Sequence, residues 1–212
     1  MFGDKTVNDK TLEKVNFDKG FLRLGEKYLV GVDEVGRGPL AGPVVCCAVI
    51  MPFDEDRIID GIDDSKKVSE KKRNLLSDRI KEVALDYAIC EISPQEIDEI
   101  NILEATKLCM KRCVESLKLK ADAVLIDAVD IRVDLRKEPI VKGDAQSYSI
   151  GAASILAKVY RDNLMVEYDK IYPEYLFAKN KGYGTKDHIN AIKENGACPL
   201  HRRTFIKNFL AK

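Results

Sequence analysis

The sequence predicts an α/β fold, in which a sheet of strands packs against helices. Short, continuously apolar segments recur along the 212 residues, and such segments are typical of strands that are buried on both faces. Longer segments with helical periodicity lie between them. This alternation is typical of layered α/β domains, and the length suffices for one sizeable core or for a domain with an appended subdomain.

The strands are expected in five apolar segments, at residues 28–33, 43–50, 87–93, 123–128 and 139–144. The continuous apolar character of the first two predicts burial on both faces. A turn rich in glycine and proline, GRGPLAGP, separates these two segments. The last segment is expected to be a short strand that ends in a turn.

The helices are expected in the segments between and after the strands. Ser69 can cap a helix that begins at Glu70, and Pro94 is typical of another helix start. Small residues in SIGAASILAK would let a long helix pack closely against the sheet. Further helical segments are predicted at residues 102–119, 148–170 and near 185–195.

Composition and charge exclude some classes of protein. Lys plus Arg and Asp plus Glu both number 35, so the net charge is zero and any nucleic-acid binding must depend on a local basic patch. Residues 179–207 are rich in Lys and Arg and could supply one. No apolar segment reaches membrane-spanning length, and the polar N-terminus lacks the apolar stretch of a signal peptide. We therefore expect a cytoplasmic protein with no membrane partner.

The six cysteines are expected to be buried, reduced thiols, because they are scattered and contain no C-x-x-C pair. Cys109 and Cys113 could share a helix face and bind a metal ion. We discount such a site, since no histidine or further cysteine completes the set in the sequence.

Four carboxylates stand at the ends of the predicted strands. Asp33 and Glu34 end the first strand, Asp127 ends another, and Asp144 ends the last. Buried charge is unfavourable, so these acids are expected in a crevice at the sheet edge, where open α/β sheets bind ligands. Carboxylates gathered there would repel one another unless hard cations such as Mg²⁺ or Mn²⁺ bind between them. Two such ions, about 3.5–4 Å apart, could clamp a phosphodiester.

From the residues alone, a plain structural interpretation of these acids stays open, because aspartate also favours the turns that follow strands. Other chemistries fit less well. The two histidines, His188 and His201, both lie near the C-terminus, and neither a nucleophile elbow nor a Walker A motif occurs. The spacing of glycines after Glu34 superficially matches a dinucleotide-binding fingerprint, but Pro43 leads straight into a strand and not into a helix.

Five motifs in order make the chain resemble bacterial ribonuclease HII. They are DEVGRGPLAGPVV, DDSKKVSEKKR, LIDA, KGDAQSYSIGAASILAKVYRD and NKGYGT followed by HRRTF. The resemblance spans about residues 26–206, and the first and fourth motifs are long and specific. The sequence departs from the family's usual alanines at VVCCAV, where cysteine is similar in size.

The resemblance implies a ribonuclease H-like fold, with a mixed central sheet flanked by helices and a C-terminal helical extension. We expect a catalytic domain at residues 23–170 and a C-terminal helical substrate-binding part at 171–212. They are preceded by a polar N-terminal extension at 1–22, which matches no motif and has some helical potential. The implied substrates are RNA/DNA hybrids and DNA duplexes that contain single ribonucleotides. Hydrolysis would occur on the 5′ side of a ribonucleotide and leave 3′-hydroxyl and 5′-phosphate ends. We expect a monomer that uses two Mn²⁺ or Mg²⁺ ions.

The resemblance also assigns site residues. By motif position, Asp33, Glu34, Asp127 and Asp144 match the metal-binding carboxylates. A loop that reads the ribose 2′-hydroxyl corresponds to Gly36, Arg37 and Gly38, and a tyrosine that packs on the following sugar corresponds to Tyr183. Phosphate contacts are expected from Lys66, Ser147, Lys158, Lys186 and Arg202. Asp162 is a rival for the fourth carboxylate, and His188 is expected to be structural.

Three alternative functions stay open. A related nuclease or resolvase that acts on DNA is disfavoured by the GRG turn and by KGYGT. A module that binds hybrids without cutting them is disfavoured by the presence of all four carboxylates. A phosphohydrolase for small substrates is disfavoured by the basic tail and by the missing phosphate loop.

Overall fold

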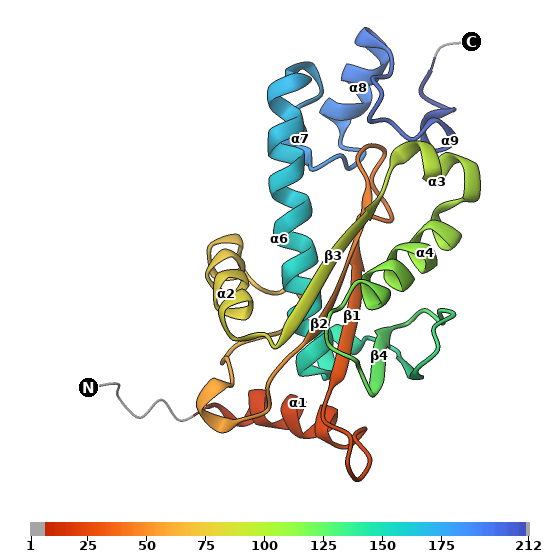
Figure 1. Cartoon of the computed structure of the whole chain (residues 1–212). Helices are drawn as coiled ribbons and strands as arrows, with labels where there is room; N and C mark the ends of the chain where they lie inside the picture. The colour runs from red at the N-terminus through yellow and green to blue at the C-terminus, as the bar shows by residue number, and fades with distance from the viewer. Residues whose placement is uncertain (1–6, 211–212) are drawn as a thin grey trace.

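The computed structural model describes residues 7–210 and is built around one five-stranded sheet (Figure 1). The strand order is β3-β2-β1-β4-β5. The first three strands in this order are antiparallel, whereas β1, β4 and β5 run parallel. The predicted α/β class is confirmed, and the sheet is mixed. The strands are β1 (Leu29–Val35), β2 (Val44–Ile50), β3 (Asp86–Ile92), β4 (Ala123–Asp127) and β5 (Arg136–Ile140).

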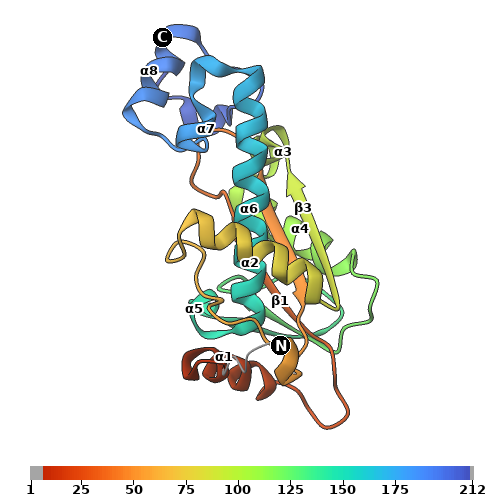
Figure 2. The same ribbon diagram turned by 90° about the vertical axis from the view of Figure 1, so that its left-hand side faces the viewer.

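Helices cover both faces of the sheet (Figures 1 and 2). One face carries α3 and α4, and the other carries α2 and the long helix α6. The N-terminal helix α1 packs against α6. The helices, including two short 3-10 turns, are α1 (Asp9–Lys19), η1 (Glu55–Arg57), α2 (Glu70–Val83), α3 (Pro94–Ile100), α4 (Ile102–Glu115), α5 (Gly143–Gln146), α6 (Tyr148–Ile171), η2 (Pro173–Tyr175), α7 (Phe177–Asn180), α8 (Lys186–Asn195) and α9 (Arg203–Ile206).

Strand β2 explains why two helix layers are needed. Its sequence VVCCAVI is buried along its whole length. Because side chains alternate between the faces of a strand, Cys46 packs in the cluster on the α4 side and Cys47 in the cluster on the α6 side. A strand that is apolar on both faces can be stable only between two covering layers, which agrees with the burial that the sequence predicts.

Helix α6 approaches the sheet closely at Gly31 of β1. A Cβ atom at Gly31 would lie 2.2 Å from the backbone carbon of Ser149, so no other residue fits there without displacing the helix. The predicted close packing of the small-residue segment is therefore confirmed. Farther along, α6 leaves the sheet and reaches the C-terminal helices (Figure 1), where Met165 packs with Phe177 and Ile192 in a separate apolar cluster.

The last predicted strand is wrong in its position. Strand β5 covers Arg136–Ile140, whereas we expected a strand at 139–144. Lys142 adopts a left-handed conformation with φ of 56°, and Gly143–Gln146 form one helical turn. β5 lies at the sheet edge and is half exposed, so it has no apolar pattern to mark it. Its parallel pairing with β4 decides where it lies, with Ile140 opposite Asp127.

The polar N-terminal segment contains a well-anchored helix. Asn8 caps α1 by accepting a hydrogen bond from the Thr11 amide, and this confirms the helical potential of the segment. Lys14 and Asp18 of this helix are buried against the body of the protein. The division of the chain into three parts stays a prediction, and residues 1–6 of the first part lie outside the described residues.

The cysteines are all free thiols, and Cys90 alone among them is only half buried. The Cys109 thiol donates to the carbonyl of Cys90 at 3.2 Å, and that of Cys113 to the carbonyl of Cys46 at 3.1 Å. Two cysteines of the sheet, Cys46 and Cys90, thus lie against the helix pair. Even so, within residues 7–210 only an acidic group brings three metal-ligating atoms close together.

Within residues 7–210, no helix is long and apolar enough to cross a membrane.

Candidate active site

Three of the four predicted carboxylates meet at the carboxyl ends of β1 and β4. These strands are parallel neighbours, and Val32 is paired with Ile126, so the next residues, Asp33 and Asp127, leave the paired segment side by side. Oxygen atoms of Asp33, Glu34 and Asp127 all lie within 4.8 Å of one another. The sheet topology therefore brings together acids that are more than ninety positions apart in the chain.

Asp144 reaches the same place by another route. It lies in the single turn of α5 and not at a strand end, so the predicted strand-end position is wrong. The Gly143 amide donates to Asp127 Oδ1 at 2.7 Å, which fastens this turn to the end of β4. A Cβ atom at Gly143 would lie 2.5 Å from Ile150 Cδ1, so glycine permits the close approach. Asp144 is thereby held beside Asp127.

The four carboxylates line one open cavity of about 460 Å³. Residues from several parts of the chain complete its wall. They are Asp33, Glu34, Val35, Gly36, Arg37, Gly38, Ser65, Lys66, Asp127, Asp144, Ser154, Lys158 and Tyr183. The structure thus gathers all four acids, the GRG loop, Tyr183 and two of the predicted lysines in one place.

Burial raises the pKa of each of the four carboxylates in the cavity, and a neighbouring negative charge adds to the rise. For Asp33 the largest cause is burial, followed by the charges of Glu34 and Asp127, and its pKa lies well above the usual range. Burial is also the main cause for Glu34, where the Arg37 guanidinium partly offsets it, and for Asp127. The pKa of Asp144 is raised by burial and then by the negative charge of Asp64. The cavity therefore favours positive charge.

The donor set fits a hard divalent cation. Glu34 Oε2 is buried and has no hydrogen-bond partner among the described residues. Leaving a buried charged oxygen without a partner costs on the order of 1–3 kcal/mol or more. A cation held by Asp33, Glu34 and Asp127 would remove this cost, and carboxylate oxygens are ligands that Mg²⁺ and Mn²⁺ accept. The carboxylate cluster is thus a candidate divalent-metal site.

The GRG loop, Gly36 to Gly38, forms the rim next to the acids. Gly36 has a left-handed φ of 95°, and a Cβ atom there would lie 2.3 Å from Arg161 Nε and 2.8 Å from the carbonyl oxygen of Pro43. Both the conformation and the space therefore require glycine. Arg37 Nη1 lies 3.6 Å from Glu34 Oε1, so the loop's cation faces the carboxylates.

Two buried arginines support this loop from beneath. Arg202 donates to the carbonyl oxygens of Gly36 at 2.5 Å, Arg37 at 2.9 Å and Gly42 at 2.8 Å. Arg161 donates to three further carbonyls, those of Pro43, Ala41 and Lys181. Backbone carbonyls thus satisfy both guanidinium groups, and the turn is held rigidly over the cavity.

The sequence analysis predicted that Arg202 and Ser147 contact phosphates, and the structure contradicts this prediction. Both side chains are fully buried. Arg202 is committed to the loop carbonyls, and Ser147 caps α6 by accepting a hydrogen bond from the Ile150 amide at 3.0 Å. A phosphate cannot reach either group in this structure, so both have a supporting role.

The other predicted residues divide between the cavity and elsewhere. Lys66 and Lys158 line the cavity, but Lys186 lines a separate pocket with Leu176 and Asp187. Asp162 is not among the residues that line the cavity. Its carboxylate pairs with Lys158 at 2.6 Å and lies 3.9 Å from Arg73.

Tyr183 and His188 are connected in the C-terminal part. The Tyr183 side chain is 40% exposed and faces the cavity beside the GRG loop. His188 is buried and contacts the Tyr183 carbonyl at 2.9 Å and His201 Nε2 at 3.1 Å, as expected for a structural histidine. This contact helps to hold the segment that carries the tyrosine.

Sequence reasoning missed several supporting residues. Arg161, which donates to the carbonyl oxygens beneath the GRG loop, was given no role from the sequence. Ser65 and Ser154 line the cavity and hydrogen-bond to each other at 2.9 Å. Asp64 acts on the pKa of Asp144. All four lie inside motifs that the sequence analysis singled out, which was the available signal, but their contacts depend on segments far apart in the chain.

The mixed sheet, its flanking helices and the carboxylates at its edge define the ribonuclease H-like class of fold. The family model for ribonuclease HII matches residues 30–208. A ribonuclease HII of Clostridioides difficile (strain 630) is 51% identical over 207 residues, which cover 97% of this chain and 78% of that protein. The chain belongs to the ribonuclease HII family, and it is therefore an enzyme of the ribonuclease H type.

Solved structures agree with this assignment. The crystal structure of ribonuclease H2 from Pyrococcus horikoshii OT3 superimposes with a TM-score of 0.73 at 26% identity, covering 86% of this chain and 97% of that one. Ribonuclease HII in the PCNA complex from Archaeoglobus fulgidus gives a TM-score of 0.72 at 26% identity, over 87% and 97% of the two chains. The ribonuclease H-like fold that the motifs implied is confirmed.

Proposed function

We propose that this enzyme hydrolyses the RNA strand of RNA/DNA hybrids and cuts on the 5′ side of single ribonucleotides within duplex DNA. The products carry 3′-hydroxyl and 5′-phosphate ends. One observation carries the proposal: the four carboxylates, the GRG loop and Tyr183 line the same cavity. A site for phosphodiester hydrolysis and a loop suited to reading a ribose are thus adjacent.

In this proposal the carboxylates hold two divalent ions, Mg²⁺ or Mn²⁺. Asp33 and Asp127 are the central ligands, and Glu34 and Asp144 complete the site or orient the attacking water. Bound metal would lower the pKa of water and neutralise charge on the phosphate. The hydrogen bond from the Gly143 amide to Asp127 Oδ1 keeps one carboxylate oxygen oriented, which supports a central role for Asp127.

The GRG loop and Tyr183 select the ribonucleotide. Gly36 and Gly38 let backbone groups approach the minor groove, where the 2′-hydroxyl distinguishes RNA from DNA. The nearest atom to a Cβ at Gly38 would be Tyr183 Cε1, 3.9 Å away, so the tyrosine ring lies across from the loop. A sugar seated at this rim of the cavity would contact both the loop and the ring. The 2′-hydroxyl is recognised and is not the nucleophile.

The remaining contacts are electrostatic. Lys66 and Lys158 line the cavity and are placed to meet phosphates beside the cut. Lys186 is exposed at the start of α8 and would meet the duplex farther away. We propose that the enzyme acts as a cytoplasmic monomer in ribonucleotide removal during DNA replication and repair.

The test is cleavage of a labelled duplex that contains one ribonucleotide. Wild-type protein should cut on its 5′ side, and a chelator should abolish the cut. Asp33→Asn and Asp127→Asn should each lose cleavage, because each removes a central ligand. The exposed Asp56, which makes no ion pair among the described residues, offers Asp56→Asn as the control that keeps cleavage.

Two outcomes would reject the proposal. Near wild-type cleavage by Asp33→Asn or Asp127→Asn would remove the carboxylates from the mechanism. Cleavage of an all-DNA duplex at a comparable rate would instead support a DNA nuclease of the same fold.

A further inference from the structure

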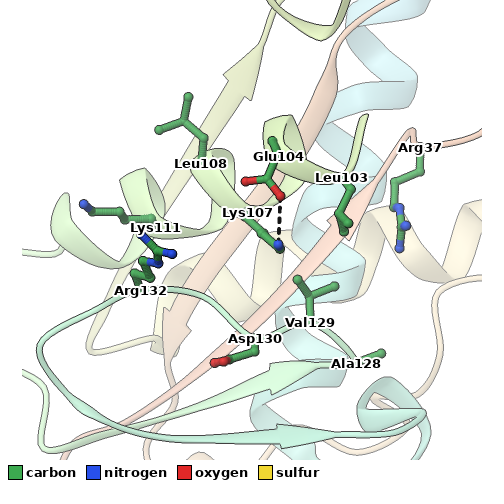
Figure 3. A pocket seen from close by; sticks show the side chains of 10 residues that line it. All are labelled: Arg37, Leu103, Glu104, Lys107, Leu108, Lys111, Ala128, Val129, Asp130 and Arg132. Carbon is green, nitrogen blue, oxygen red and sulfur yellow. Dashed lines mark hydrogen bonds and ion pairs between the residues drawn. The ribbon is translucent and has the colours of Figure 1, made fainter. Parts of the chain in front are cut away.

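A second and larger hollow lies beside the carboxylate cavity (Figure 3). Its volume is about 720 Å³, and it runs between α4 and the loop that follows β4. We call it the α4 groove. It is lined by Arg37, Leu103, Glu104, Lys107, Leu108, Lys111, Ala128, Val129, Asp130 and Arg132.

The α4 groove is continuous with the active site at two points. Arg37 lines both the groove and the carboxylate cavity. Ala128 directly follows Asp127, and its left-handed φ of 52° turns the chain from the carboxylate into the groove wall. A ligand seated on the carboxylates and extending past Arg37 would therefore enter the groove.

The charge along the α4 groove is positive. Arg37 stands at one end, Lys111 and Arg132 at the other, and Lys107 between them (Figure 3). The lining also holds two acids. Glu104 pairs with Lys107 at 2.8 Å, so these two charges cancel, and Asp130 pairs at 2.6 Å with Lys137, which lies outside the lining. The positive charges with no acidic partner in the lining are therefore those of Arg37, Lys111 and Arg132.

Arg132 is the least committed of these cations. It is exposed, and its guanidinium makes no ion pair with any residue between 7 and 210. Lys111 has only a loose partner, Glu115, at 3.7 Å. Both groups can turn toward a ligand without breaking a strong contact.

The lining suits a polymer better than a small molecule. Its cations sit on long side chains at an open surface, and the exposed apolar side chain of Leu103 lies between Arg37 and Lys107 (Figure 3). Phosphates of a nucleic-acid strand need spaced positive charges, and sugars can pack on apolar side chains.

We propose that the α4 groove binds the sugar-phosphate backbone of the substrate duplex next to the cut site, with Lys111 and Arg132 as phosphate contacts. This inference rests on the proposed function, because it takes a duplex as the substrate. It gives a protein with zero net charge a set of phosphate contacts in addition to those expected from the lysine-rich C-terminal segment.

The experiment compares two double variants that remove the same charge. Lys111→Gln with Arg132→Gln changes the groove, and Lys118→Gln with Lys120→Gln changes two exposed lysines outside it. Each is measured for KM and kcat on a duplex with one ribonucleotide. Binding to an all-DNA duplex is measured by fluorescence anisotropy over a range of salt concentrations, with thermal unfolding as a check on folding.

We expect the groove variant to raise KM about tenfold, with a smaller effect on kcat, because two phosphate contacts are lost. The slope of log Kd against log salt concentration should fall by about two, since each phosphate contact contributes about 0.9. The control variant should stay close to wild type in both measurements.

The outcomes separate this inference from the proposed function. If wild type cuts the duplex and the groove variant behaves like the control, the groove is not a phosphate site. If wild type binds duplex DNA but does not cut at the ribonucleotide, the proposed function fails. The salt slopes of the two double variants would still show whether the α4 groove contacts phosphates. Failure of the wild type to bind any duplex would reject both.

Discussion

Two neighbouring regions of this enzyme contain buried charged side chains, and they differ in whether those side chains have hydrogen-bond partners. In the carboxylate cavity, burial and then the charge of neighbouring acids raise the pKa of Asp33 and Glu34, and Glu34 Oε2 lacks a partner among the described residues. Beneath the GRG loop, Arg161 and Arg202 are fully buried, yet backbone carbonyls satisfy them. Satisfied buried charge stabilises the framework, whereas unsatisfied buried charge marks the place where a ligand of opposite sign is needed.

The two regions also depend on each other. The GRG loop lies between them, with Arg37 facing Glu34 on one side and its carbonyl bound by Arg202 on the other. A rigid loop keeps the substrate-reading backbone in position while the acids repel one another. The unfavourable electrostatics of the cavity can therefore persist without distorting the loop that must select the substrate.

The largest expected effect concerns the satisfied region. Arg202→Met should lower the free energy of unfolding by about 3 kcal/mol or more, because several buried carbonyls lose their donor. Urea unfolding would measure it, with the exposed neighbour as the control in Arg203→Met. A loss no larger than that of the control would mean that the buried guanidinium is not what holds the loop.

The next prediction tests whether burial also makes an ionised carboxylate outside the cavity, that of Asp18, unfavourable for stability. Asp18 accepts from the Ser149 amide at 2.7 Å, but burial raises its pKa to about 6. A raised folded pKa means that its stability contribution is present below pH 3.8 and is lost as pH rises through about 6. Asp18→Asn should therefore stabilise the protein above pH 6 by up to about 3 kcal/mol, at 1.36 kcal/mol per pKa unit.

Unfolding in urea at several pH values measures this difference, which should shrink toward pH 4. A variant that is less stable than wild type at pH 7.5 would show that the ionised carboxylate at the start of α6 is favourable, and the parallel with the cavity would fail.

The smallest expected effect concerns the stability of the cavity without metal. Asp33→Asn should raise the free energy of unfolding in chelator by about 1 kcal/mol, because it removes one of the repelling charges while abolishing cleavage. Added Mg²⁺ or Mn²⁺ should stabilise wild type more than this variant. Thermal unfolding with and without metal measures both effects, and Asp56→Asn serves as the exposed control.

A destabilised Asp33→Asn protein in chelator would contradict the comparison. It would mean that the Asp33 carboxylate makes a favourable interaction in the metal-free protein. The gathered carboxylates would then not destabilise the protein when no cation is bound.

Much of the site was predictable because its signals are local. Acids directly after buried apolar strands are unfavourable unless they have a ligand, so Asp33, Glu34 and Asp127 stand out in the sequence. The glycines of the GRG loop stand out as well, and Gly36 does adopt a left-handed conformation. Four of the five strands lie where the apolar pattern placed them.

The tertiary structure decided what depends on partners far along the chain. Strand β5 is polar and is placed only by its pairing with β4, and Asp144 follows it into a helical turn. Arg202 looks like a surface cation in the sequence, but the carbonyls that bury it lie about 160 positions away. The α4 groove likewise exists only where α4 meets the loop after β4.

The sequence by itself thus determined the element types and the chemistry of the carboxylates, because period, propensity and the cost of burying charge act within a few residues. Only the tertiary structure decided which charges are satisfied and which are not. Satisfaction depends on partners that the fold brings within hydrogen-bond distance, and no local pattern encodes their positions.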